Sequence, residues 1–143
     1  MIKWINMKIY VGYKYRNSSD KEKIKDVLSE VSSKLVSMGH TTFILGRDKF
    51  QWVHHTSPSK SLTPIIKNMK KSDAFLAIIE CSSKSNGLLF ESLCAKIFGK
   101  KIILAVKDNI SPKPFSFFTK NIIKFEDYGD LTNELEENLP KYL

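Results

Sequence analysis

The run Ala74-Phe-Leu-Ala-Ile-Ile79 is apolar at every position, and it decides the fold class. A strand that is covered on both faces needs apolar side chains throughout, whereas a strand with one face in water alternates apolar and polar residues. Ile102-Ile-Leu-Ala-Val106 has the same character. The two runs therefore predict the central strands of a sheet that is buried between two layers of helices.

Three shorter stretches predict the other strands of this sheet. They are rich in β-branched and aromatic residues, and a glycine closes the first two. The stretches are Lys8-Ile-Tyr-Val-Gly12, Thr41-Thr-Phe-Ile-Leu45 before Gly46, and Asn121-Ile-Ile-Lys-Phe125.

Four segments between and after these strands predict helices. The first has apolar residues at the helical period of 3.6, and Gly39 follows it as a C-terminal cap. The second has Ser61 or Thr63 as its N-cap and Pro64 in its first turn, where proline is favoured. The first predicted helix follows the N-cap candidates Ser18-Ser19-Asp20 and has its apolar residues between Ile24 and Met38. The others span residue 61 or 63 to about 71, about 87–98, and 131–143, and residues 47–60 are predicted to form a long surface loop.

Strands that alternate with helices specify a parallel sheet with helices on both faces. The predicted fold class is therefore α/β, a flavodoxin-like or Rossmann-like three-layer sandwich with a five-stranded parallel sheet, in a single domain over residues 1–143. Ligands of such sheets bind beyond the carboxyl ends of the strands. The loops expected at that edge are residues 12–17, 46–60 and 80–86.

Composition narrows the function classes. The chain has 143 residues and 42% hydrophobic content, which fit a globular domain rather than a disordered chain. No apolar run is long enough to span a bilayer, and residues 1–7 are too short and too polar a stretch for the apolar region of a secretory signal. Two cysteines make no disulfide scaffold, so we expect a cytoplasmic protein without a membrane partner. The net charge of +8 comes mostly from scattered lysines, with Arg16 and Arg47 as the only arginines, so we expect no nucleic-acid partner.

Sequence motifs for cofactors and metals are missing. The chain has no G-x-G-x-x-G, no P-loop and no G-x-S-x-G motif. Cys81 and Cys94 form no C-x-x-C pair, and His54-His55 lack the spacing of metal ligands on a helix. We therefore expect neither a cofactor nor a metal.

Glu91 stands out as a catalytic candidate. It falls in the first or second turn of the helix predicted at 87–98, so its carboxylate should point toward the ligand edge, and no cation lies three or four residues away. The helix N-terminus favours the ionised form, whereas the apolar neighbours oppose it. Such a carboxylate suits a nucleophile or a stabiliser of an oxocarbenium-like centre. The alternative interpretation is a partly exposed acid that balances the helix dipole.

Two other groups of residues are candidates for binding substrate. The loop before Glu91 carries hydroxyl and amide groups at a helix N-terminus, which suits a phosphate or carboxylate, although ordinary N-capping explains them equally. The first strand and its loop offer aromatic rings and two cations, although Tyr10 alternatively packs beneath the sheet edge. The candidates are Ser83, Ser85, Asn86 and Gly87 in the first group and Tyr10, Gly12, Tyr13, Lys14 and Arg16 in the second.

These residues resemble the nucleoside 2-deoxyribosyltransferase family, including its 2'-deoxynucleoside 5'-monophosphate N-glycosidase branch. The similarity is carried by residues 8–12, 72–79, 85–92 and 99–102, and in element order it covers nearly the whole chain. It implies cleavage or transfer at the N-glycosidic bond of a nucleoside or nucleoside 5'-monophosphate. Gly87-Leu-Leu-Phe-Glu91 matches the family's G-x-x-[FY]-E motif, which makes Glu91 the nucleophile, and the family's strand-one tyrosine falls on Tyr10.

The resemblance also implies a shared site. A phosphate-loop arginine of the N-glycosidase branch falls on Arg16, and a serine supplied by a neighbouring subunit matches Ser116 if one residue is skipped. A homodimer or larger homo-oligomer that acts on a small nucleoside or nucleotide is therefore expected. Phe115, Phe117 and Phe118 would suit its interface, or would instead close the sheet edge.

Two departures from the family pattern keep other functions open. The family's glycine-rich phosphate loop is replaced here by Tyr13-Lys-Tyr-Arg-Asn17. The family's base-side aspartate falls near Ile65, where no acid lies. Asp73, at the start of the third strand, is interpreted as structural. Residues 65–73 and 85–91 also resemble TIR-type domains, which implies an NAD glycohydrolase that uses Glu91, although the usual tryptophan before the glutamate is missing. A third alternative is a non-catalytic nucleotide-binding or signalling module.

Overall fold

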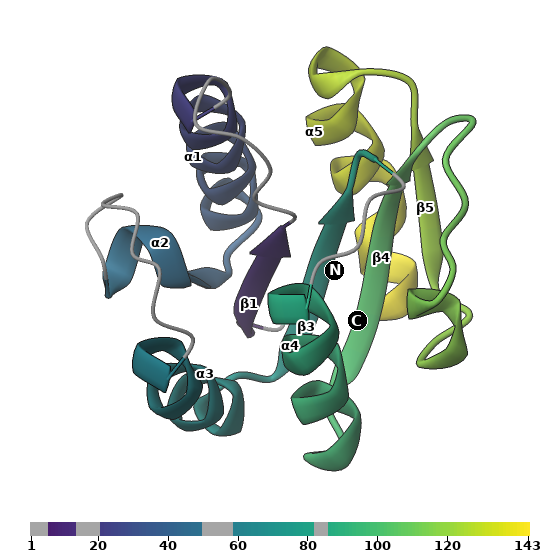
Figure 1. Ribbon diagram of the computed structural model, residues 1–143. Coiled ribbons are helices and arrows are strands. Elements are labelled where there is room, and N and C mark those ends of the chain that lie inside the picture. The colour runs from purple at the N-terminus through teal and green to yellow at the C-terminus, as the bar shows by residue number, and fades with distance from the viewer. Residues whose placement is uncertain (1–5, 14–20, 50–58, 82–85) are drawn as a thin grey trace.

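Five parallel strands form one sheet at the centre of the protein. The computed structural model describes residues 6–13, 21–49, 59–81 and 86–143 (Figure 1). The strands lie in the order β2 (Thr41–Ile44), β1 (Lys8–Tyr13), β3 (Ala74–Ile79), β4 (Lys101–Lys107) and β5 (Ile122–Phe125), and each neighbouring pair is parallel. This is the strand order of a flavodoxin-like sheet, so the predicted fold class is confirmed.

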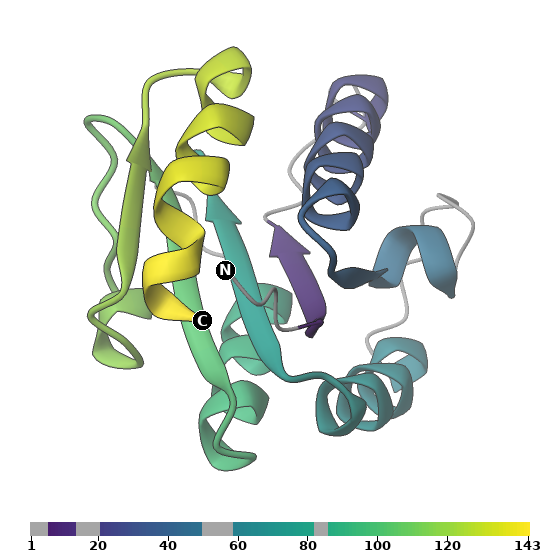
Figure 2. The ribbon, with the colours of Figure 1, turned by 180° about the vertical axis from the view of Figure 1, so that it is seen from behind.

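Helices cover both faces of the sheet (Figures 1 and 2). The helices α1 (Lys21–Ser37) and α5 (Tyr128–Asn138) pack on one face, and α3 (Ser59–Lys71) and α4 (Asn86–Ile97) pack on the other. The one-turn helix α2 (Leu45–Asp48) follows β2 directly. Two 3₁₀ turns, η2 (Phe115–Phe117) and η3 (Leu139–Tyr142), lie before β5 and after α5. Among the described residues, no helix combines the length and the apolar character that crossing a membrane requires.

The side chains of β1 alternate between two apolar cores. Ile9 and Val11 belong to the cluster beneath α1 and α5, whereas Tyr10 belongs to the cluster beneath α3 and α4. Each of the three is at most 1% exposed. Because strand side chains alternate with a period of two, only one face of β1 can contribute to a site beneath α4.

Two helices begin earlier than the sequence predicts. The helix α3 begins at Ser59, so Pro64 lies in its second turn rather than its first. In the second turn, the missing N–H of proline costs the helix one hydrogen bond. The helix α5 begins at Tyr128 because the carboxylate of Asp127 accepts a hydrogen bond from the backbone N–H of Asp130, 2.9 Å away. The long loop predicted at 47–60 is interrupted at its start, since Arg47 and Asp48 belong to α2.

A polar network fastens α2 to β2 and α1. The guanidinium of Arg47 donates to Ser32 Oγ at 2.8 Å and to the Thr42 carbonyl at 3.1 Å, and it forms an ion pair with Asp48 at 2.9 Å. The Asp48 carboxylate in turn accepts from the Ile44 N–H at 2.8 Å. Burial acts to raise the pKa of Asp48, but the hydrogen bonds from Arg47 and Ile44 outweigh it and lower that pKa below its ordinary value. The network fixes where the chain leaves β2.

Arg47→Ala is expected to lower the free energy of unfolding by about 1–2 kcal/mol, because it removes hydrogen bonds to partly buried partners. The ion pair itself adds little, since both side chains remain about a third exposed. Urea unfolding followed by circular dichroism measures the effect. Lys49→Ala, at the exposed neighbouring position, is the matched control and should change stability by much less. Equal losses in the two variants would contradict a role for the network.

Candidate active site

The candidate site lies between β1 and β3, the point from which the chain adds β2 on one side of the sheet and β4 and β5 on the other. The strand β1 stands between β2 and β3, and the connections that follow β1 and β3 lead to α1 and α4, on opposite faces of the sheet. The carboxyl ends of such neighbouring strands leave a crevice in which flavodoxin-like proteins bind ligands. In this sheet that edge is formed by the carboxyl ends of β1 and β3 and by the start of α4, which follows β3.

Tyr10 and Glu91 meet beneath α4. The Tyr10 hydroxyl donates a hydrogen bond to Glu91 Oε2 at 2.5 Å, across 81 positions of the sequence. The Tyr10 ring is held by Phe43, with ring centroids 4.9 Å apart, and by the edge of Phe75, at 5.6 Å. Tyr10 is completely buried, so both its ring and its hydroxyl have fixed positions.

Glu91 reaches Tyr10 because α4 turns one face toward the sheet. Leu88, Glu91, Ser92 and Ala95 follow the helical period on that face, and all four are buried. Glu91 itself is only 7% exposed. This excludes the interpretation of Glu91 as a partly exposed acid that only balances the helix dipole.

The Tyr10–Glu91 contact and its burial shift the pKa values of both side chains. Burial raises the pKa of Glu91 from 4.5 to about 7, against the opposing effect of the Tyr10 hydrogen bond. Within the described residues, no cation forms an ion pair with Glu91. Burial, with the Glu91 charge adding to it, raises the pKa of Tyr10 well above its ordinary value, so Tyr10 remains a donor at neutral pH. The arrangement holds a carboxylate that is half ionised near pH 7.

Cys94 lies one turn beyond Glu91 on the same helix and is also buried. Burial and the Glu91 charge both raise the pKa of its thiol. A thiol in this state stays protonated, so Cys94 lacks the character of a nucleophile. In the parts of the chain that the structure describes, no group of three or more His, Cys, Asp or Glu side chains could hold a metal ion.

The other sequence-predicted residues do not gather at one place in the structure. Gly12 lies on the same face as Tyr10, against Phe75 and Leu88, and Asn86 and Gly87 form the exposed start of α4. Lys14, Arg16, Ser83 and Ser85 lie outside the described residues.

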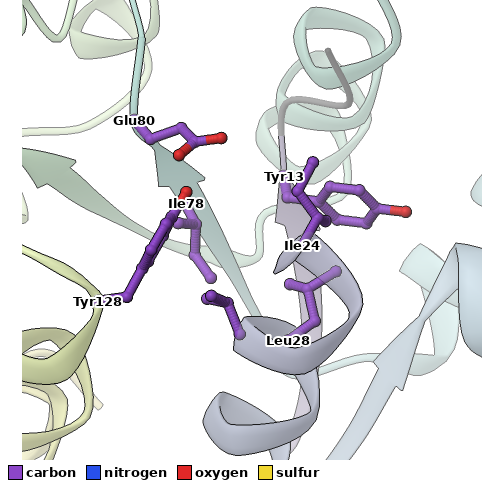
Figure 3. Close-up of a pocket in the computed structure, with 7 residues that line it drawn as sticks. Tyr13, Ile24, Leu28, Ile78, Glu80 and Tyr128 are labelled. Carbon is purple, nitrogen blue, oxygen red and sulfur yellow. The ribbon is translucent and has the colours of Figure 1, made fainter. Parts of the chain in front are cut away.

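Tyr13 is not brought to Glu91. The strand extends through residue 13, and its alternation turns Tyr13 to the α1 and α5 face. There Tyr13 lines a cavity of about 10 Å³, room for one water molecule, with Ile78, Glu80 and Tyr128 (Figure 3). The sheet therefore separates Tyr13 from the carboxylate of Glu91.

Ser116 is not brought to Glu91 within one chain either. It lies in η2, which leads into the beginning of β5, and the nearby Thr119 hydroxyl donates to the carbonyl of Ile102 at the start of β4. This is the amino end of the sheet, opposite to the ligand edge. Phe115 is buried and so is not an exposed interface residue, whereas Phe117 is 80% exposed. A homodimer in which Ser116 reaches a neighbouring site stays a prediction.

The structure gives Ile65 and Asp73, the two positions compared with acids of the family pattern, structural environments. Ile65 is a core residue, 3% exposed, beneath α3. The carboxylate of Asp73 accepts a hydrogen bond from the N–H of Lys8 at 2.8 Å, at the amino ends of β1 and β3. The structural interpretation of Asp73 is therefore confirmed.

Comparison with solved structures finds the same fold in nucleoside-processing proteins. A CMP N-glycosidase of Clostridium botulinum, BcmB, superimposes with a TM-score of 0.66 at 17% identity, over 91% of this chain and 98% of that one. A 2-deoxyribosyltransferase of Bacillus psychrosaccharolyticus gives a TM-score of 0.61 at 24% identity, over 88% and 90%. A conserved protein of Enterococcus faecalis V583 gives 0.65 at 12% identity, over 93% and 99%.

These likenesses establish the fold and support, at that level, the resemblance to the nucleoside 2-deoxyribosyltransferase family. No protein-family model matches the chain, and no curated protein matches it significantly. Because one fold can host unrelated reactions, the chemistry has to be argued from the site.

Proposed function

We propose that the protein cleaves the N-glycosidic bond between a base and the sugar of a nucleoside or nucleoside 5'-monophosphate, with Glu91 as the nucleophile. The observation that carries the proposal is the buried Glu91 carboxylate, held by the Tyr10 hydroxyl at 2.5 Å on the helix that follows β3. The shared fold of an N-glycosidase and a deoxyribosyltransferase supports it.

The reaction needs a carboxylate that is ionised, fixed and shielded from water. In the first step a Glu91 oxygen would form a bond to the anomeric carbon as the bond to the base breaks, and the base would leave with the electron pair and take up a proton. In the second step water, or a second base, would displace the resulting ester and restore the carboxylate. Burial favours this chemistry because a poorly hydrated carboxylate is a stronger nucleophile and interacts more strongly with positive charge on the sugar.

Tyr10 would orient the nucleophile. Its hydrogen bond fixes one Glu91 oxygen and stabilises the ionised form, which counteracts the effect of burial on the Glu91 pKa. Asn86 and Gly87, at the exposed start of α4, would meet the sugar or its phosphate near the helix N-terminus. Lys14, Arg16, Ser83 and Ser85 remain proposed binding residues from the sequence.

Release of free base tests the proposal. Purified protein would be incubated with a panel of ribo- and deoxyribonucleosides, their 5'-monophosphates and NAD, and products would be separated by chromatography. Base release from a nucleoside or nucleotide is the expected result, and a second free base in the mixture distinguishes transfer from hydrolysis. Nicotinamide release from NAD alone would move the protein to the TIR-like alternative. Nucleotide binding without turnover would make it a binding module.

Base release should increase with pH through an apparent pKa of about 7, because Glu91 has to be ionised to attack and burial raises its pKa to that value. The rate constant kcat/KM, measured between pH 5 and pH 9, reports this limb for the free enzyme. Circular dichroism at each pH serves as the control that the protein stays folded. A rate that is flat or falls between pH 6 and pH 8 would argue against Glu91 as the nucleophile.

A further inference from the structure

Gly12 occupies a position in β1 that has no room for a side chain. A Cβ atom built there would lie 2.7 and 2.8 Å from the ring atoms Cε1 and Cζ of Phe75, and 2.9 Å from Cδ1 of Leu88. Contacts below 3.0 Å force a neighbour to move. Gly12 pairs with Ala77 in the sheet and has no positive φ, so the backbone would accept another residue and only space requires glycine.

The two residues that would have to move cannot do so freely. Phe75 is completely buried and Leu88 is 1% exposed, both in the core beneath α3 and α4. Interiors are close-packed, so an added methyl group shifts its neighbours or the element that carries them. Here that element is α4, because Leu88 lies in its first turn.

Both neighbours of Gly12 lead directly to the candidate nucleophile. Leu88 precedes Glu91 by three residues on the buried face of α4, and its carbonyl accepts a hydrogen bond from Ser92 Oγ at 2.8 Å. Phe75 packs its ring against Tyr10, the hydrogen-bond partner of Glu91. A side chain at position 12 would therefore press on the neighbours of both Tyr10 and Glu91.

We propose that Gly12 is a positioning residue: it lets Leu88 pack directly on β1 and so sets the distance at which α4 presents Glu91 to Tyr10. This replaces the substrate contact expected for Gly12 from the sequence. A strand glycine that marks the close approach of another element accounts for the residue type. The catalytic part of the inference rests on the proposed function, whereas the packing part does not.

The test combines Gly12→Ala with Leu88→Ala. In Gly12→Ala, displacement of α4 should weaken the Tyr10–Glu91 hydrogen bond, raise the pKa of Glu91 above that of the parent protein and lower kcat at pH 7 by at least about tenfold, with KM little changed. Leu88→Ala opens space that the added methyl group and the Phe75 ring can occupy. The double variant should therefore match Leu88→Ala alone in kcat and in the Glu91 pKa.

Two readouts separate this inference from the proposed function. The Glu91 pKa is followed by carbon NMR of labelled carboxyl groups and needs no substrate, and kcat and KM come from base release. If no variant and not even the parent releases base, the proposed function fails while the pKa comparison still decides the packing role. Should Gly12→Ala not fold, the comparison of Leu88→Ala with the double variant decides.

The inference would be overturned if Gly12→Ala changed kcat and the Glu91 pKa equally in the parent protein and in the Leu88→Ala variant. So would a raised KM with an unchanged Glu91 pKa, which would return Gly12 to a substrate contact. A double variant that is clearly worse than Leu88→Ala would overturn it as well.

Discussion

Glu91→Gln should reduce base release by about a thousandfold or more, because an amide cannot form the ester with the anomeric carbon. The replacement keeps the size of the side chain and leaves an oxygen that can accept from the Tyr10 hydroxyl, so the fold should persist. Single-turnover base release on the best substrate measures the loss. The matched control is Glu136→Gln, an exposed glutamate that pairs with Lys34 on the opposite face of the sheet and should keep full activity. A Glu91→Gln protein with more than about a tenth of the parent rate would rule out the nucleophile role.

The same variant should remove the contribution of Glu91 to the pH dependence of stability. Glu91 has a pKa of about 7 in the folded protein against 4.5 as its ordinary value, so its protonated form is the one that folding favours. A group with a raised pKa contributes stability that is complete below pH 4.5 and is lost as pH rises to about 7. The difference between the two values corresponds to about 3 kcal/mol of unfolding free energy.

Measuring the difference between the two proteins isolates this effect. Relative to Glu91→Gln, the parent protein should lose about 3 kcal/mol of unfolding free energy between pH 4.5 and pH 7.5, while groups common to both cancel. Urea titrations at several pH values provide the comparison. A difference that does not change with pH would mean that Glu91 is solvated in the folded protein.

Tyr10→Phe is expected to lower base release at pH 7 by about 10- to 100-fold, since a hydrogen bond to a charged group contributes about 1.5–3 kcal/mol. Loss of that bond removes an interaction that lowers the Glu91 pKa, so the ascending limb of the pH profile should move to higher pH. The measurement is kcat/KM against pH, and activity should recover in part at pH 8 to 9.

Tyr128→Phe is the matched control for this change. Tyr128 lies on the opposite face of the sheet and lines the cavity near Tyr13, so loss of its hydroxyl should leave the profile unchanged. A Tyr10→Phe protein whose activity falls without movement of the limb would indicate that Tyr10 acts on substrate rather than on Glu91.

The fold was predictable because its central strands are apolar at every position. Only buried strands of a parallel sheet explain 74–79 and 102–106 together with the helices around them, and the observed strands differ by at most one residue at either end. Glu91 could be identified because a carboxylate without a neighbouring cation is unusual on an apolar helix. Tyr10 was a binding candidate from its strand and from the family resemblance, but its hydrogen bond to Glu91 could not be predicted, since a contact across 81 positions leaves no local signal.

The positions of the other candidate residues depend on the three-dimensional path of the chain, which a sequence pattern does not contain. The sequence ended the first strand at Gly12, and the structure extends it by one residue, which sends Tyr13 to the other face. Ser116 depends on the path between β4 and β5, which returns to the amino end of the sheet. The contact between Gly12 and Leu88 joins two elements whose separation only the packed structure defines.

Because side chains alternate along β1, the register of this strand decides whether Tyr10 can reach Glu91. A shift by one residue would turn Ile9 and Val11 toward α4 and aim Tyr10 at α1, so a single insertion in the strand would exchange the two cores. Such a change alters no residue of the proposed catalytic pair, yet it would separate Tyr10 from Glu91 and unpack both layers at once. A point substitution in β1 disturbs the packing at one position, whereas an insertion or deletion within β1 misplaces several side chains, so we expect related sequences to keep the length of this strand.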